Sequence, residues 1–136
     1  MAIWLKDTRQ PQALPALQVK LIYNFTYRLS GSREVAAILT EKMFLRQASN
    51  HNSAVMLLKQ AWEDFLKHYS RHNFTTDNPL HQALLSLAPE PRGAVILRDI
   101  LGYSYGQIAT ILNKSDLEVG KLIATGRQGV RQAWKN

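Results

Sequence analysis

The segment SYGQIATILNKSDLE, residues 104–118, carries two helix-starting signals. Ser104 and Ser115 are each followed three residues later by a glutamine or a glutamate, and this spacing forms a capping box at the start of a helix. Asn113 lies between the two signals. Asparagine is one of the few residues besides glycine that accept the left-handed conformation of a sharp turn. The segment therefore predicts two helices joined by a tight turn.

The apolar residues of this part of the chain fit two helices that face each other. Residues 104–112 are the expected supporting helix, and residues 116–134 the expected recognition helix, of a helix-turn-helix unit. The side chains expected between them are Ile108, Leu112, Val119 and Ile123. Two neighbouring helices of an ordinary bundle show the same spacing, so the pattern alone leaves DNA binding open.

Outside this unit, apolar residues recur every three or four positions, which predicts an all-α fold. Gly31 is expected to end a first amphipathic helix, and Ser32 to cap a second. The apolar stripe of the first helix is expected to consist of Leu14, Leu17, Leu21, Phe25 and Leu29. The polar residues 50–53 then precede a third helix, which runs to about Tyr69. No alternation typical of strands competes with this interpretation.

The domain organisation follows from one short linker, residues 74–79, whose last residue is a proline suited to a first helical turn. We expect a helical unit in residues 1–73 and a helix-turn-helix unit in residues 80–136. A fourth helix is expected up to about Leu87, and a fifth from about Ala94 to Leu101.

The composition of the chain limits its function. The 136 residues include no cysteine, so disulfides and thiolate metal sites are excluded. The net charge of +7 favours a polyanionic partner, although ten basic and five acidic residues lie in residues 1–73, against seven and five in residues 74–136. The start of the chain has no apolar run long enough for a signal peptide or membrane span, which predicts a cytoplasmic protein without a membrane partner.

The second half resembles region 4 of sigma-70 family proteins. The matching segments are LLSLAP (84–89), VILRD (95–99) and GYSYGQIA (102–109), together with Arg92, Val119 and Arg127. Upstream, YRLSGSRE (27–34), Ala36, Leu39, Phe44 and Leu45 resemble region 2 of the extracytoplasmic-function sigma factors, and Trp62 follows at nearly the family spacing.

The resemblance implies partners and site residues. Region 2 of the family binds the clamp helices of the largest subunit of RNA polymerase, which here implicates Glu41, Phe44 and Arg46. Region 4 binds promoter DNA through its recognition helix. The expected DNA-binding residues are Lys114, Ser115, Lys121, Arg127 and Arg131. An anti-sigma factor, a partner sigma factor and a second copy of the chain are further candidate partners, and no cofactor or metal is implied.

Departures from the family pattern are expected to weaken both polymerase binding and promoter recognition. In region 2, an acidic pair that serves polymerase binding in the family is replaced by Ala37 and Ile38, and the expected glutamine is Glu41, so core binding should be weaker. Family positions that commonly carry basic or polar side chains on the recognition helix are Gly120, Leu122, Ala124 and Thr125 here. The six-residue linker spans at most about 20 Å when extended, whereas the promoter elements of the family lie more than one duplex turn, about 34 Å, apart.

Three hypotheses remain at this point, none of them enzymatic. The first is a shortened sigma-like protein that binds RNA polymerase, with promoter DNA as a candidate second partner. The second is a sigma-derived adaptor that acts through protein contacts, and the third is a small dimeric helix-turn-helix repressor. The scattered carboxylates show no convergent nucleophile or phosphate loop. His68 and His72 have the spacing of a metal-binding pair, but a solvated basic helix face explains them more simply.

Overall fold

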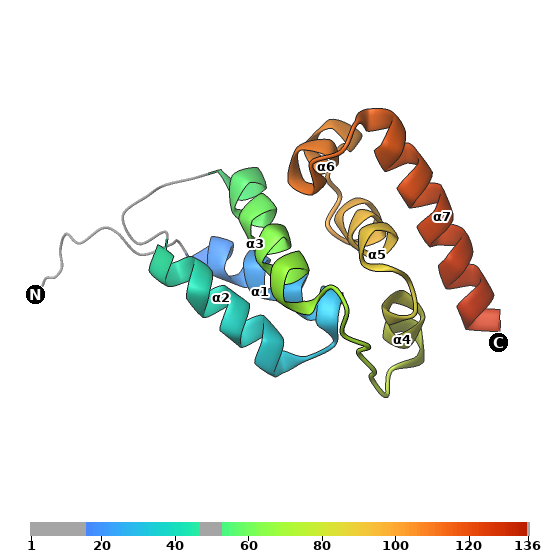
Figure 1. Cartoon of the computed structure of the whole chain (residues 1–136), viewed down its shortest axis with the longest axis horizontal. Coiled ribbons are helices and arrows are strands. Elements are labelled where there is room, and N and C mark those ends of the chain that lie inside the picture. Colours follow the sequence, from blue (N-terminus) through green and yellow to red (C-terminus); the bar gives the residue numbers. More distant parts are fainter. Residues whose placement is uncertain (1–15, 47–52, 136) are drawn as a thin grey trace, which may run out of the picture.

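A computed structural model describes residues 16–46 and 53–135, and this part contains helices and no strands (Figure 1). The first half contains α1 (Ala16–Ser30), α2 (Arg33–Arg46) and α3 (Ala54–Tyr69). The second half contains α4 (Pro79–Leu85), α5 (Pro89–Val95), a π-helical turn η1 (Ile96–Ile100), α6 (Tyr105–Leu112) and α7 (Asp116–Lys135). The predicted all-α fold is confirmed. None of the described helices is long and apolar enough to cross a membrane.

The turn between α1 and α2 forms where the sequence predicts it. Gly31 has a φ of +66°, and its amide donates to the carbonyl of Tyr27 to close α1. The Ser32 hydroxyl then accepts from the amide of Val35 at 3.1 Å and caps α2. This φ lies in the left-handed backbone region, which glycine adopts more easily than any other residue, so this corner depends on glycine.

The inner face of α1 differs in one respect from the expected one. Ile22, Phe25 and Leu29 are fully buried, whereas Leu17 is 80% exposed. Leu14, the first residue of the expected apolar stripe, lies outside the described residues, as do residues 50–52 of the expected polar break.

The fourth and fifth helices differ slightly from their predicted boundaries. Asn78 caps α4, with its side-chain oxygen accepting from the amide of His81 at 2.9 Å, and α4 ends at Leu85 rather than near Leu87. The fifth helix begins at Pro89 and continues into η1, where the Leu101 amide donates to the Ile96 carbonyl at 3.0 Å. This bond spans five residues instead of four, a π-helical step that periodicity did not predict.

The predicted helix-turn-helix unit is present. Both capping boxes form: the hydroxyls of Ser104 and Ser115 each accept from the amide three residues later, and the Gln107 and Glu118 side chains accept from the serine amides. Asn113 has a φ of 56°, the left-handed conformation that the turn requires. The four side chains expected between the helices are all buried: Ile108, Leu112, Val119 and Ile123.

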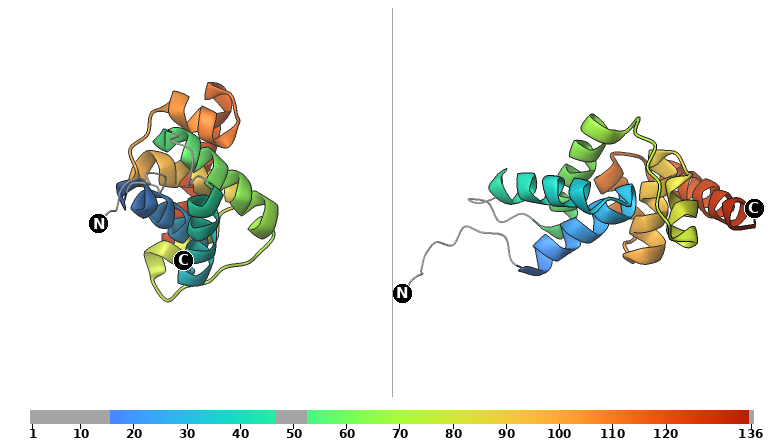
Figure 2. Two further views of the ribbon diagram at one scale, coloured as in Figure 1. Left: turned by 90° about the vertical axis from the view of Figure 1, so that its left-hand side faces the viewer. Right: turned by 90° about the horizontal axis from the view of Figure 1, so that it is seen from below.

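The two halves share one hydrophobic core rather than two. The buried cluster contains Phe25 and Trp62 from the first half together with Leu97 and Ile108 from the second. Helix α3 packs against α6, and α1 packs against α4, α5 and η1. Figures 1 and 2 show that α2 and α7 consequently lie at opposite ends of the molecule.

Candidate nucleic-acid and protein-binding surfaces

The contact between the halves is centred on a buried arginine. Arg92 of α5 is only 4% exposed, and its guanidinium donates to three backbone carbonyls. Its Nη1 lies 2.6 Å from the Leu29 oxygen at the end of α1, and its Nη2 lies 2.7 Å from the Leu87 oxygen and 3.3 Å from the Leu85 oxygen. Burial lowers the pKa of Arg92 from its ordinary value, because the charged form loses hydration. Arg92 thus connects both halves through their backbones.

Three further contacts complete what we call the joint, defined as the contacts of Arg92, Trp62, His81 and Lys59 between the two halves. Trp62 packs on Gly93 so closely that a Cβ at position 93 would lie 2.8 Å from Cζ3 of the indole. The Nε2 of His81 lies 3.1 Å from the Arg28 oxygen, the neighbour of the carbonyl that Arg92 binds. Lys59 donates to the Thr110 carbonyl at 3.4 Å. The last turn of α1 is therefore capped by side chains from the other half.

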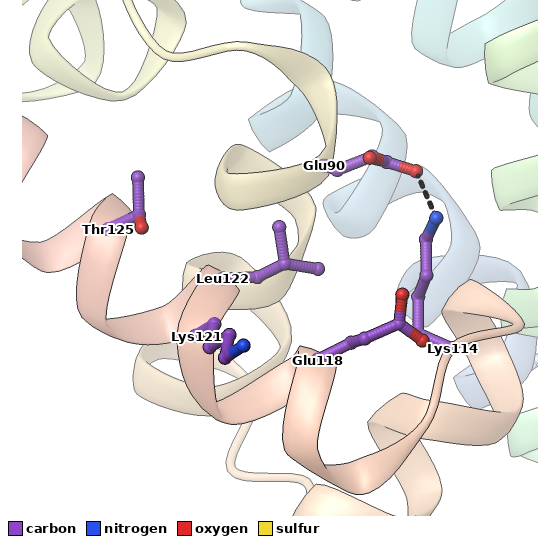
Figure 3. Close-up of a pocket in the computed structure, with 6 residues that line it drawn as sticks. All are labelled: Glu90, Lys114, Glu118, Lys121, Leu122 and Thr125. Carbon is purple, nitrogen blue, oxygen red and sulfur yellow. Dashed lines mark ion pairs between the residues drawn. The ribbon is translucent and has the colours of Figure 1, made fainter.

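The predicted DNA-binding residues lie around α7, but two of the cations are already paired. Figure 3 shows Lys114, just before α7, beside Glu90 of α5, with Nζ and Oε2 2.9 Å apart. The hydrogen bond that Lys114 donates to the Glu90 carboxylate is the main reason that the pKa of Lys114 is raised. The Ser115 hydroxyl is used as the cap of α7.

Arg127 is paired in the same way, with a carboxylate of η1. Its Nη2 and Nε lie 2.7 and 3.0 Å from the two oxygens of Asp99, a bidentate geometry. This hydrogen bond is the first cause that lowers the pKa of Asp99, and the Arg127 pKa is raised in turn. Asp99 thus competes with a phosphate for the same donors.

Lys121 and Arg131 are the predicted DNA-binding cations that remain without an ion pair among the described residues, and both are exposed. Lys121 lines a shallow cavity of about 220 Å³ at the start of α7 (Figure 3). Glu90 and Glu118 line the same cavity, so carboxylates surround the one lysine placed early enough on α7 to reach a base edge.

The predicted polymerase-binding residues lie on α2, with different environments. Glu41 is exposed, Phe44 is half-buried against the core, and Arg46 bonds to Asp64 of α3 with Nη1 and Oδ2 3.1 Å apart. The outer face of α2 also exposes Ile38 by 47% and Leu45 by 68%. The sequence analysis did not assign Ile38 or Leu45 to this site. Apolar residues on the outer face of α2 as well as on its inner face are a signal that could have indicated them.

The aromatic residues of α3 serve packing, whereas the two histidines near its end are exposed. Trp62 and Phe65 are buried. His72 stacks on Phe74 with ring centroids 5.6 Å apart, and His68 lies 3.1 Å from the Lys42 ammonium. In the part of the chain that the structure describes, no three histidine, aspartate or glutamate side chains gather as a metal site would require.

The arrangement of these helices defines a class of protein: an all-helical pair of units, of which the second is a helix-turn-helix module. Residues 77–128 match the family model described as "Sigma-70, region 4". The whole chain is similar in structure to the sigma factor RpoE from Bartonella quintana, solved in complex with the anti-sigma factor NepR. The TM-score is 0.73 at 16% sequence identity, over 88% of this chain and 92% of that one.

These comparisons bear out the resemblance predicted from the sequence. Residues 77–128 match sigma-70 region 4, and the chain has a fold similar to that of a sigma factor.

Proposed function

We propose that the protein acts in transcription by binding core RNA polymerase through the outer face of α2, without chemistry of its own. The observation that carries this proposal is the pair of exposed apolar side chains, Ile38 and Leu45, on either side of Glu41. Positions 38, 41 and 45 lie on one helix face, because residues three and four apart are neighbours on an α-helix. Anchors at this spacing suit helix-to-helix docking, such as contact with the polymerase clamp helices.

Specific promoter recognition contributes little in this proposal. A good bidentate contact with a base discriminates by about 1 to 3 kcal/mol. Among the described residues, Lys121 is the only predicted cation near the start of α7 that makes no ion pair. Arg131 is placed further along α7, where contact with phosphates is the simpler role. We therefore expect weak duplex binding that depends on salt more than on sequence.

The polymerase contact is tested by measuring the affinity of fluorescently labelled protein for core RNA polymerase. Leu45→Asp should weaken binding about tenfold or more, because it places a charge in the centre of an apolar contact. Leu117→Asp is the matched control, since Leu117 is 71% exposed at the opposite end of the molecule. Equal affinities of the two variants would refute the α2 contact, and no binding by the unaltered protein would refute polymerase association altogether.

DNA contact needs its own experiment. Lys121→Ala should weaken binding to duplex DNA at low salt, because phosphate contacts dominate such affinity. Unchanged affinity would count against a DNA-facing α7.

The second candidate function is a sigma-derived adaptor that binds an anti-sigma factor or a partner sigma factor. It is favoured by the paired cations, Lys114 with Glu90 and Arg127 with Asp99, which leave α7 poor in free donors. Binding to a purified anti-sigma factor without binding to core polymerase would favour the adaptor. The remaining alternative, a dimeric repressor, requires duplex binding and dimerisation with no polymerase binding at all.

A further inference from the structure

An apolar groove, which we call the α4 groove, runs from α7 across α4 and η1 to the end of α1. Two adjoining hollows of about 360 and 280 Å³ form it, and they share Leu80, Leu84 and Ile100 as their floor. The first hollow extends to Arg131 of α7, and the second to Tyr27 and Arg28 of α1. The groove is separate from α2 and from the cavity in Figure 3.

The floor of the α4 groove is apolar surface left in contact with water. Leu80 is 57% exposed and Ile100 40% exposed, although both stand next to buried residues of the core. A leucine and an isoleucine that line one hollow gain free energy when another apolar surface covers both. Clustered apolar exposure with a polar rim is typical of a site for protein contact.

Charge at the two ends indicates what kind of surface fits. Arg28 and Arg131 are exposed, and neither makes an ion pair within residues 16–46 and 53–135. Arg127, which also lines the groove, is balanced by Asp99. Two positive charges therefore remain at opposite ends of an apolar floor, and carboxylates are the complementary groups.

The shape of the groove favours a helix over a small molecule. Ligand sites that hold small molecules usually enclose most of the ligand surface, whereas two of the three floor residues, Leu80 and Ile100, are themselves about half exposed. Leu80 and Ile100, which stand exposed over the buried Leu84, instead form a shallow apolar trough. An amphipathic helix needs such a trough and contributes its own apolar stripe.

We propose that the α4 groove binds an amphipathic helix of a partner protein, with its apolar stripe on Leu80 and Ile100 and its carboxylates at Arg28 and Arg131. Tyr27 and Arg28 belong to the first half and the rest of the lining to the second. The occupant therefore binds the two halves only while they are docked, and it stabilises that arrangement by linkage. This inference goes beyond polymerase binding through α2 and does not depend on it.

The test uses three synthetic peptides and fluorescence anisotropy with the full chain. The first is an amphipathic peptide of about 18 residues, long enough for a marginal helix, with a leucine stripe flanked by glutamates. The second carries lysines in place of the glutamates, and the third is a scrambled acidic peptide. The acidic amphipathic peptide should bind best. Equal binding of all three, or of none, would refute the proposal.

Matched variants locate the binding. Leu80→Asp should weaken binding of the acidic peptide about tenfold or more, and it should fold, because an acidic residue suits the first turn of α4. Leu117→Asp is the control, since Leu117 is likewise the second residue of its helix and is 71% exposed. Arg28→Glu and Arg131→Glu should each weaken binding severalfold and reduce its salt dependence. Peptide binding that Leu80→Asp leaves unchanged would overturn the proposal.

Two further measurements distinguish this proposal from the polymerase contact through α2 and from a dimer of the chain. Leu45→Asp should leave peptide binding unchanged, so failure of the polymerase contact and failure of the groove are seen separately. Sedimentation would reveal a dimer of the chain that Leu80→Asp dissociates. That result would overturn the proposed partner helix and assign the groove to a second copy of the chain.

Discussion

The joint between the halves and the outer face of α7 use arginine in opposite ways. At the joint, Arg92 is buried and donates to three backbone carbonyls, including that of Leu29 in the other half. On α7, Arg127 is exposed and its donors are taken by the Asp99 carboxylate. Arg92 stabilises the fold by donating to backbone carbonyls. Arg127 is neutralised by Asp99, at a position where the family resemblance implies a free cation for binding DNA.

The two cases show that the packing of the fold and the charge of its surface can vary independently. Packing residues such as Trp62, Ile108 and Val119 keep the scaffold, because a close-packed core is sensitive to every change of volume. Surface charges are not constrained by packing, so Glu90 and Asp99 can cancel cations without disturbing the fold.

The largest expected effect is at the joint. Arg92→Met keeps much of the side-chain length but leaves three buried carbonyls without their donor. We expect the free energy of unfolding to fall by about 3 kcal/mol or more, measured by urea denaturation. Arg98→Met is the control, because Arg98 donates to the Tyr103 carbonyl at the surface. A loss no larger than that of the control would show that Arg92 does not secure the halves.

The close approach of Trp62 to Gly93 gives the next effect. In Gly93→Ala the new Cβ would lie 2.8 Å from the indole, whose ring is buried and has little room to move. Gly106→Ala is the matched change, since nothing lies within 4 Å of its Cβ. Gly106→Ala should stabilise by about 0.5 to 1 kcal/mol, and Gly93→Ala should fall below it by about 1 to 3 kcal/mol. Equal stabilities would contradict a tight joint.

Removing the carboxylates that pair with the cations around α7 should increase the salt dependence of duplex DNA binding. The double variant Glu90→Gln with Asp99→Asn releases Lys114 and Arg127. Each new phosphate contact should steepen the slope of log affinity against log salt by about 0.9 on duplex DNA. The control, Glu34→Gln with Asp77→Asn, changes the net charge equally at distant positions. Equal slopes for the two double variants would mean that the ion pairs do not mask a DNA surface.

The smallest effect concerns acid stability. The Arg127 hydrogen bond lowers the pKa of Asp99, so the pair stabilises the fold fully above the ordinary pKa of 3.8. That contribution is lost as the pH falls through the lower folded value. Asp99→Asn should therefore unfold slightly more easily than the unaltered protein at neutral pH, and the difference should shrink in acid. Thermal unfolding at a series of pH values measures it, and a constant difference would exclude a titrating pair.

Several parts of the molecule could be predicted from short-range sequence alone. The capping boxes at Ser104 and Ser115, the turn at Asn113 and the corner at Gly31 all formed as expected. Each depends on groups within about four residues of one another, so local geometry is enough to determine it. The assignment of DNA-binding and polymerase-binding roles stays a prediction.

Long-range pairings were beyond the sequence. Nothing in the spacing of the predicted cations indicated that Glu90 would reach Lys114 or that Asp99 would reach Arg127. The π-helical turn at Ile96 was likewise missed, because one inserted residue barely changes the apolar periodicity.

The sequence by itself determined the helices, their caps and the helix-turn-helix unit, because these depend on neighbours along the chain. Only the tertiary structure decided that Arg92 would join the halves, that α7 would lose free charge to Asp99 and Glu90, and that Leu80 and Ile100 would line an open groove. Those outcomes depend on which distant helices pack together, and that is settled by burial over the whole core rather than by any local pattern.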